Sequence, residues 1–370
     1  MPSIRSCSAC LDRGTLCDGN PQGCQPCLRG GFSCRRDYRA CPAIPQPDWG
    51  ETQATAEQVA GIPSAEITTA HAPLIAALTA FYNALIQLQY LREHELVRPP
   101  HVSEHIDLDA LVESGFEAQA IALILALPQV NIPRIADAEI DITPDAALPF
   151  PYLNLGSLRT ATYANTARDP FYHGQGQDQD DNEEHEHERE NWRIPPWALF
   201  ITRPDPQRGY GFTHCRIYDM RSRTLGLWSD AMVGRAGDTR RHGRLLIDAR
   251  PADEVIGEWT ASLRALAWVP SLSDRERTIQ AAPDLERVNR AIAHAQTMPE
   301  DWGAPMIRDE RRRYHAYWAQ RGIYEGCGWP DALREEELVG RRGEWNAAIR
   351  RLGAAEVDAF YRGLAGGHAI

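Results

Sequence analysis

Six cysteines near the N-terminus constrain this chain more than any other feature of its sequence. Their spacing is C-x2-C-x6-C-x6-C-x2-C-x6-C, formed by Cys7, Cys10, Cys17, Cys24, Cys27 and Cys34. A Cys-x-x-Cys turn can present two thiolates to one metal, and zinc takes four ligands in a tetrahedron. The segment is also an internal repeat, because CSACLDRGTLC is followed by the similar CQPCLRGGFSC. Two zinc ions need eight ligand positions, so six thiolates suffice if two of them bridge the metals.

Other readings of the cysteines stay open. Six cysteines in a secreted chain would allow 15 disulfide pairings, but the start MPSIRSCSAC has no apolar signal region. No stretch reaches the ~18 apolar residues of a membrane span, so we expect no membrane partner. In a reducing compartment clustered cysteines more often bind metal. Two separate incomplete sites, or a decayed cluster, are the remaining alternatives. Cys41 is expected to be a free thiol outside the module, or else a substitute ligand.

The cysteine pattern resembles the fungal Zn2Cys6 binuclear cluster, the DNA-binding module of a large class of fungal transcription factors. The resemblance covers about residues 5–36. It implies that Cys7 and Cys24 bridge two zinc ions. The sites would be completed by Cys10 and Cys17 on one metal and by Cys27 and Cys34 on the other. It also implies a sequence-specific regulator of transcription in the nucleus, with DNA as its partner.

The predicted contacts with DNA are arginines. In the family, a short basic helix follows the second cysteine and enters the major groove. Here that segment, LDRGTL, contains one base, one acid and a helix-weakening glycine. The chain has no lysine, so Arg13 is the candidate for reading a guanine edge. The candidates for phosphate contacts are Arg5, Arg29, Arg35, Arg36 and Arg39.

The charge of the module argues for weak DNA binding. Residues 1–41 hold six arginines and three aspartates, a balance of +3. Two Zn²⁺ with six thiolates contribute about −2, which leaves the module close to neutral. Nucleic-acid binders are usually strongly basic over the binding face, and the whole chain has a net charge of −12. The alternative is therefore a non-enzymatic interaction protein with a structural zinc cluster, whose body binds another protein.

The sequence predicts three parts: the zinc module 1–41, a linker 42–58 rich in proline, and a body 59–370. Within the body, residues 174–191 are strongly acidic and are predicted to be a solvated, disordered loop. His185 and His187 in this loop could bind a metal weakly, although a solvated loop is the preferred reading.

The body is predicted to be α+β, with helices flanking an antiparallel sheet. Apolar residues recurring every three to four positions indicate helices, expected at 69–96, 108–127, 253–267, 283–296, 308–321 and 331–363. Runs rich in aromatic and β-branched residues between turn residues indicate strands, expected at 197–202, 212–219, 224–229 and 245–248. The order of elements over 197–268 resembles the SUKH superfamily of interaction and immunity proteins.

The sequence predicts no enzyme. His214 and Cys215 are adjacent, but neighbouring side chains on a strand point to opposite faces, so Cys215 is expected to be a core thiol. Cys327 is expected in a glycine-flanked turn. The sequence contains no P-loop, no G-x-G-x-x-G and no H-E-x-x-H. The basic run 311–313 is interpreted as a solvated turn of helix rather than a nuclear signal.

Overall fold

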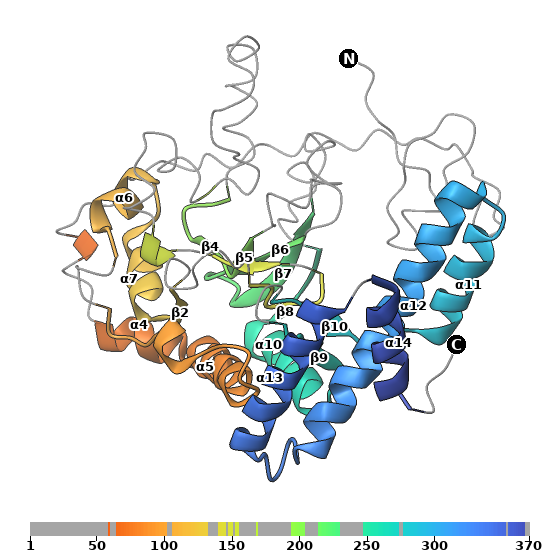
Figure 1. Cartoon of the computed structure of the whole chain (residues 1–370). Coiled ribbons are helices and arrows are strands. Elements are labelled where there is room, and N and C mark those ends of the chain that lie inside the picture. Colours follow the sequence, from red (N-terminus) through yellow and green to blue (C-terminus); the bar gives the residue numbers. More distant parts are fainter. Residues whose placement is uncertain are drawn as a thin grey trace, which may run out of the picture. The chain divides into compact units, whose positions relative to one another are not determined.

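Figure 1 shows the computed structural model of the chain. It describes residues 58–59, 64–101, 106–131, 140–145, 147–150, 152–154, 168, 194–203, 214–229, 247–273, 277–352 and 354–366. All of these belong to one compact unit, Trp49–Asp230 with Leu246–Ile370. The predicted zinc module 1–41, the acidic loop 174–191 and all of the linker 42–58 except Gln58 lie outside the described residues.

The described body is a mixture of helices and antiparallel strands, so the α+β prediction is confirmed for it. In chain order the elements are α4 Ser64–Ala70, α5 Ala72–Gln87, η1 Glu93–Glu95, β1 Leu96–Val97, α6 Leu108–Glu113, α7 Ala118–Ala126, β2 Gln129–Val130, β3 Leu148–Pro149, η3 Tyr152–Asn154, β4 Ala198–Phe200, β5 Thr202–Arg203, β6 His214–Asp219, β7 Thr224–Ser229, β8 Ile247–Pro251, α10 Ala252–Arg264, β9 Trp268–Pro270, β10 Ile279–Ala281, α11 Leu285–Ala295, α12 Glu300–Gly326, α13 Glu335–Arg351 and α14 Ala354–Leu364.

Four strands form the main sheet, in the order β4-β6-β7-β8, and each neighbouring pair is antiparallel. The turn between β6 and β7 has Arg223 at a φ of 58°. The Asp219 carboxylate accepts hydrogen bonds from the backbone N–H groups of Arg221 and Ser222, at 2.9 and 3.3 Å. An aspartate that bonds the backbone two and three residues ahead stabilises a tight turn, which fixes the hairpin.

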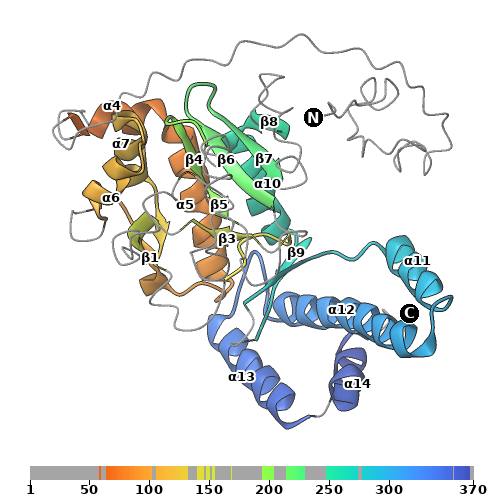
Figure 2. The same cartoon turned by 90° about the horizontal axis from the view of Figure 1, so that it is seen from above.

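Helices α5 and α10 lie side by side on one side of this sheet (Figures 1 and 2). The residues of α5 that recur at helical spacing, Leu74, Leu78, Phe81 and Leu85, are all buried. The ring of Phe81 meets that of Trp259 on α10 edge to face, with centroids 5.5 Å apart. Burial of this apolar interface is the main force that holds the two helices together.

The first predicted helix, 69–96, extends too far, because α5 ends at Gln87. Gln89 has a φ of 56°, in the left-handed region where chains commonly leave a helix. The backbone N–H of Tyr90 then donates to the carbonyl of Leu85 at 3.0 Å and turns the chain back over the last helical turn. This reversal buries Tyr90 in the core.

The second predicted helix, 108–127, is two helices, α6 and α7. The break lies at Gly115, whose φ of 76° disfavours any residue with a side chain. A Cβ atom there would also lie 2.8 Å from the guanidinium of Arg168, which donates to the carbonyl of Gly115 at 2.9 Å. The short helix α6 is capped by Asp107, which accepts from the backbone N–H of Ala110 at 3.0 Å.

The C-terminal part consists of helices α11 to α14. Helix α12 has 27 residues, far more than the predicted 308–321, and Pro305 lies inside it. A Cβ on Gly303 would lie 2.2 Å from the carbonyl oxygen of Ala295, so this glycine allows α11 and α12 to approach closely. The predicted helix 331–363 is divided into α13 and α14, because Leu352 has an extended backbone.

The two body cysteines occupy the predicted environments. Cys215 on β6 is buried, with 1% of its surface exposed, so the prediction of a core thiol is confirmed. Cys327 is buried at the end of α12, and Gly328 beside it has a φ of 90°. The run 311–313 lies on α12, with Arg311 and Arg313 exposed, as expected for a solvated turn of helix.

Candidate functional site

The residues predicted to carry the function lie outside the described part of the chain, so the structure does not bring them together. They are the zinc ligands Cys7, Cys10, Cys17, Cys24, Cys27 and Cys34 and the DNA-contact residues Arg5, Arg13, Arg29, Arg35 and Arg36. Cys41, His185 and His187 lie outside it as well, as does the side chain of His214. In the described body, no cluster of three or more His, Cys, Asp or Glu side chains is arranged to hold a metal ion. No helix of that body is long and apolar enough to cross a membrane.

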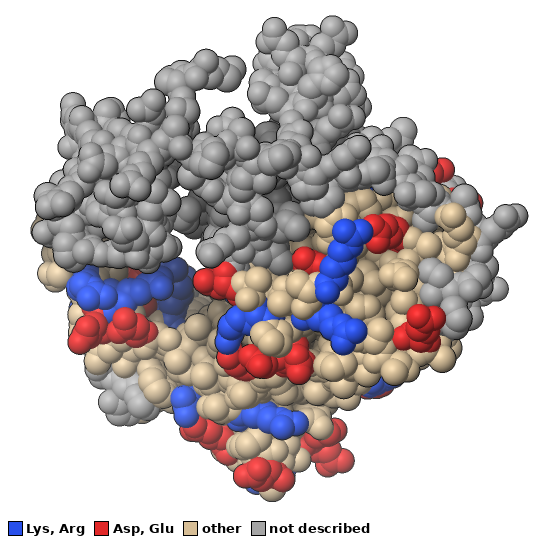
Figure 3. Space-filling model, turned by 180° about the vertical axis from the view of Figure 1, so that it is seen from behind, with Lys and Arg blue, Asp and Glu red and all other residues tan. Residues whose placement is uncertain are grey.

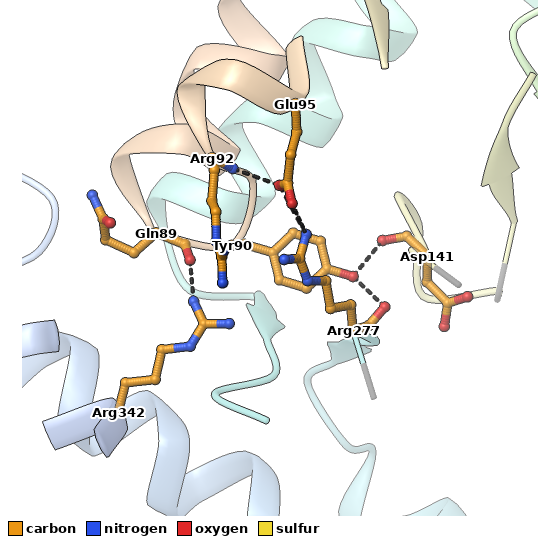
Figure 4. Close-up of polar contacts among 7 residues, drawn as sticks. All are labelled: Gln89, Tyr90, Arg92, Glu95, Asp141, Arg277 and Arg342. Atoms are coloured by element: carbon orange, nitrogen blue, oxygen red, sulfur yellow. Dashed lines mark hydrogen bonds and ion pairs between the residues drawn. The ribbon is translucent and has the colours of Figure 1, made fainter. Parts of the chain in front are cut away.

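The body itself contains a polar junction, formed by residues from four distant stretches of the chain (Figure 4). Its members are Gln89, Tyr90, Arg92, Glu95, Asp141, Arg277 and Arg342. Gln89, Tyr90, Arg92 and Glu95 lie where the chain leaves α5. Asp141 and Arg277 come from two other stretches, and Arg342 comes from helix α13.

An ion pair between Glu95 and Arg277 is the centre of the polar junction. The Nη1 atom of Arg277 donates to both carboxylate oxygens, at 2.9 and 2.8 Å. The backbone N–H of Arg92 donates to the same carboxylate at 2.8 Å. Glu95 is 1% exposed and Arg277 is 6% exposed. Charges withdrawn from water to this extent are stable only when each is partnered, so the pair fixes the segment after α5 against the chain that enters β10.

Backbone carbonyls complete the polar junction. The hydroxyl of Tyr90 donates to the carbonyl of Asp141 at 2.7 Å and contacts the carbonyl of Arg277 as well. The backbone N–H of Asp141 donates to the carbonyl of Arg277 at 2.9 Å. From α13, the guanidinium of Arg342 donates to the carbonyl of Gln89. These bonds connect the end of α5 to two loops and to a C-terminal helix.

We interpret the polar junction as a structural centre of the body. The Glu95 carboxylate is occupied by Arg277, and both of these groups are buried, so they are poorly placed to meet a substrate. The sequence carried only a weak sign of it, the charged run REHE between the apolar residues Leu91 and Leu96. Arg277, the ion-pair partner of Glu95, lies 182 residues further along the chain.

Many surface arginines of the described body pair with nearby acids. Arg250 forms a two-pronged contact with Glu258, at 2.6 and 2.7 Å. Ion pairs three or four residues apart are also present: Arg321–Glu325 in α12, Arg334–Glu337 at the start of α13 and Arg341–Glu344 within it. On the face seen in Figure 3, arginine and acidic side chains are interspersed. This face of the described body therefore does not offer the continuous basic surface that nucleic-acid binders use.

A shallow groove of about 520 Å³ runs between α5 and α10. Its walls are mostly small side chains, contributed by Ala77, Ala80, Gly257, Thr260, Ala261, Arg264 and Ala265. Such a lining offers little chemistry for a reaction, because only Thr260 and Arg264 carry polar groups.

Comparison with family models, with characterised proteins and with solved structures gives no match to this chain.

Proposed function

We propose that this chain is a zinc-binding regulator of transcription that contacts DNA in the nucleus through residues 1–41. The observation that carries the proposal is the cysteine spacing with its internal repeat. Six thiolates fit two tetrahedral zinc ions when two of the sulfurs are shared. The resemblance to the fungal zinc cluster implies that Cys7 and Cys24, the first cysteine of each half, would be the shared ligands. The arginines Arg5, Arg13, Arg29, Arg35 and Arg36 would contact DNA.

Metal content tests the zinc part of this proposal. The purified full chain should carry two zinc ions, and Cys7→Ser and Cys24→Ser should each weaken both sites, because each sulfur would serve two metals. Cys10→Ser should first loosen one site. A matched control is Cys327→Ser, a cysteine of the body, which should leave the zinc content unchanged. A content of one zinc, or equal effects of all four variants, would contradict a bridged cluster.

A salt titration tests the DNA part. Binding of the zinc-loaded chain to duplexes should weaken with salt at a slope of about −0.9 per phosphate contact. Since few arginines can reach phosphate, we expect about two or three contacts, against roughly six or more in strong binders. Asp12→Arg should strengthen binding by removing an acid and adding a cation. Arg13→Gln should lower discrimination between sequences more than total affinity, because base contacts specify and phosphate contacts position.

A specific observation favours a second function, a non-enzymatic interaction protein in which the zinc cluster is structural. That observation is the near-neutral charge of residues 1–41 together with the net charge of −12 for the chain. The resemblance of 197–268 to SUKH proteins agrees with it. If neither the wild type nor Asp12→Arg binds any duplex while the chain holds two zinc ions, this second function takes the place of the first.

A further inference from the structure

We draw no further inference here: the strongest candidate, the shallow groove between α5 and α10, is lined by a stripe of small residues that includes Ala80, Gly257 and Ala261, and nothing in the described part of the chain shows what covers it.

Discussion

The Nδ1 atom of His71 lies 2.8 Å from the hydroxyl oxygen of Tyr218, and the two rings meet edge to face. His71 precedes α5 directly, and Tyr218 lies on β6 in the middle of the main sheet. Burial raises the pKa of Tyr218 to about 12, so its O–H group is intact at neutral pH and can donate to a neutral imidazole. This bond ties the start of α5 to the sheet.

Acid should weaken the whole body through His71. Burial, and then the charge of Arg223, lower the pKa of His71 from its ordinary 6.5. The unfolded state therefore takes up the proton first as pH falls below 6.5, and the free energy of unfolding drops. One group contributes at most about 1.4 kcal/mol per pH unit. Urea unfolding at pH 7.5, 6.5 and 5.5 should show a smaller drop for His71→Gln than for the wild type. The control His94→Gln, at an exposed position, should show the same drop as the wild type. If the unfolding free energy of His71→Gln fell with pH as steeply as that of the wild type, the prediction would be wrong.

Breaking the ion pair in the polar junction should be costly. Glu95→Gln leaves Arg277 as a buried charge without its carboxylate, which should lower the free energy of unfolding by about 3–5 kcal/mol. The double variant Glu95→Gln with Arg277→Met removes that charge and should recover part of the loss. The control is Glu93→Gln, whose partner Arg98 is exposed, with an expected cost of about 1 kcal/mol or less. Urea unfolding at neutral pH measures all three. Equal losses for Glu95→Gln and Glu93→Gln would be inconsistent with a buried pair.

Two glycines of α12 should respond in opposite directions to alanine. In Gly303→Ala the new Cβ would lie 2.2 Å from the carbonyl oxygen of Ala295, so α11 and α12 must move apart. Overpacking of this kind costs about 1–3 kcal/mol. At Gly322 a Cβ meets no atom within 4 Å, so Gly322→Ala should stabilise the helix by up to about 1 kcal/mol. The midpoint of thermal unfolding, measured for both variants, tests this prediction. A higher midpoint for Gly303→Ala than for the wild type would contradict the close approach of Gly303 to the Ala295 carbonyl.

The elements that the sequence predicted well are those with a local cause. The hairpin of β6 and β7 follows from its aromatic and β-branched residues and its turn, and the buried face of α5 follows from its apolar spacing. The errors have distant causes. Helix α5 ends early because Tyr90 turns inward to carbonyls of Asp141 and Arg277. In α12, Gly303 disfavours a helix when the sequence is considered alone. The carbonyl of Ala295 on α11 leaves no room for a Cβ at this position, which explains the glycine.

The same difference between local and distant causes separates the candidate sites. Metal binding by cysteines depends on spacing within a short segment, so the sequence alone predicts the ligands. The polar junction joins Glu95 to Arg277 across 182 residues, and no spacing rule links such positions.

Removing zinc should leave the body folded. The buried side chains that join α5 to α10, such as Phe81, Leu85 and Trp259, all come from the body itself. Excess chelator should therefore release two zinc ions from the full chain without changing the urea midpoint of its tryptophan fluorescence. Cys7→Ser should likewise reduce the zinc content and keep that midpoint. Cys215→Ser places a hydroxyl in the core, at a cost of about 1–3 kcal/mol, and should lower the midpoint without changing the zinc content. A chelator that lowers the midpoint as Cys215→Ser does would show that the body depends on the metal.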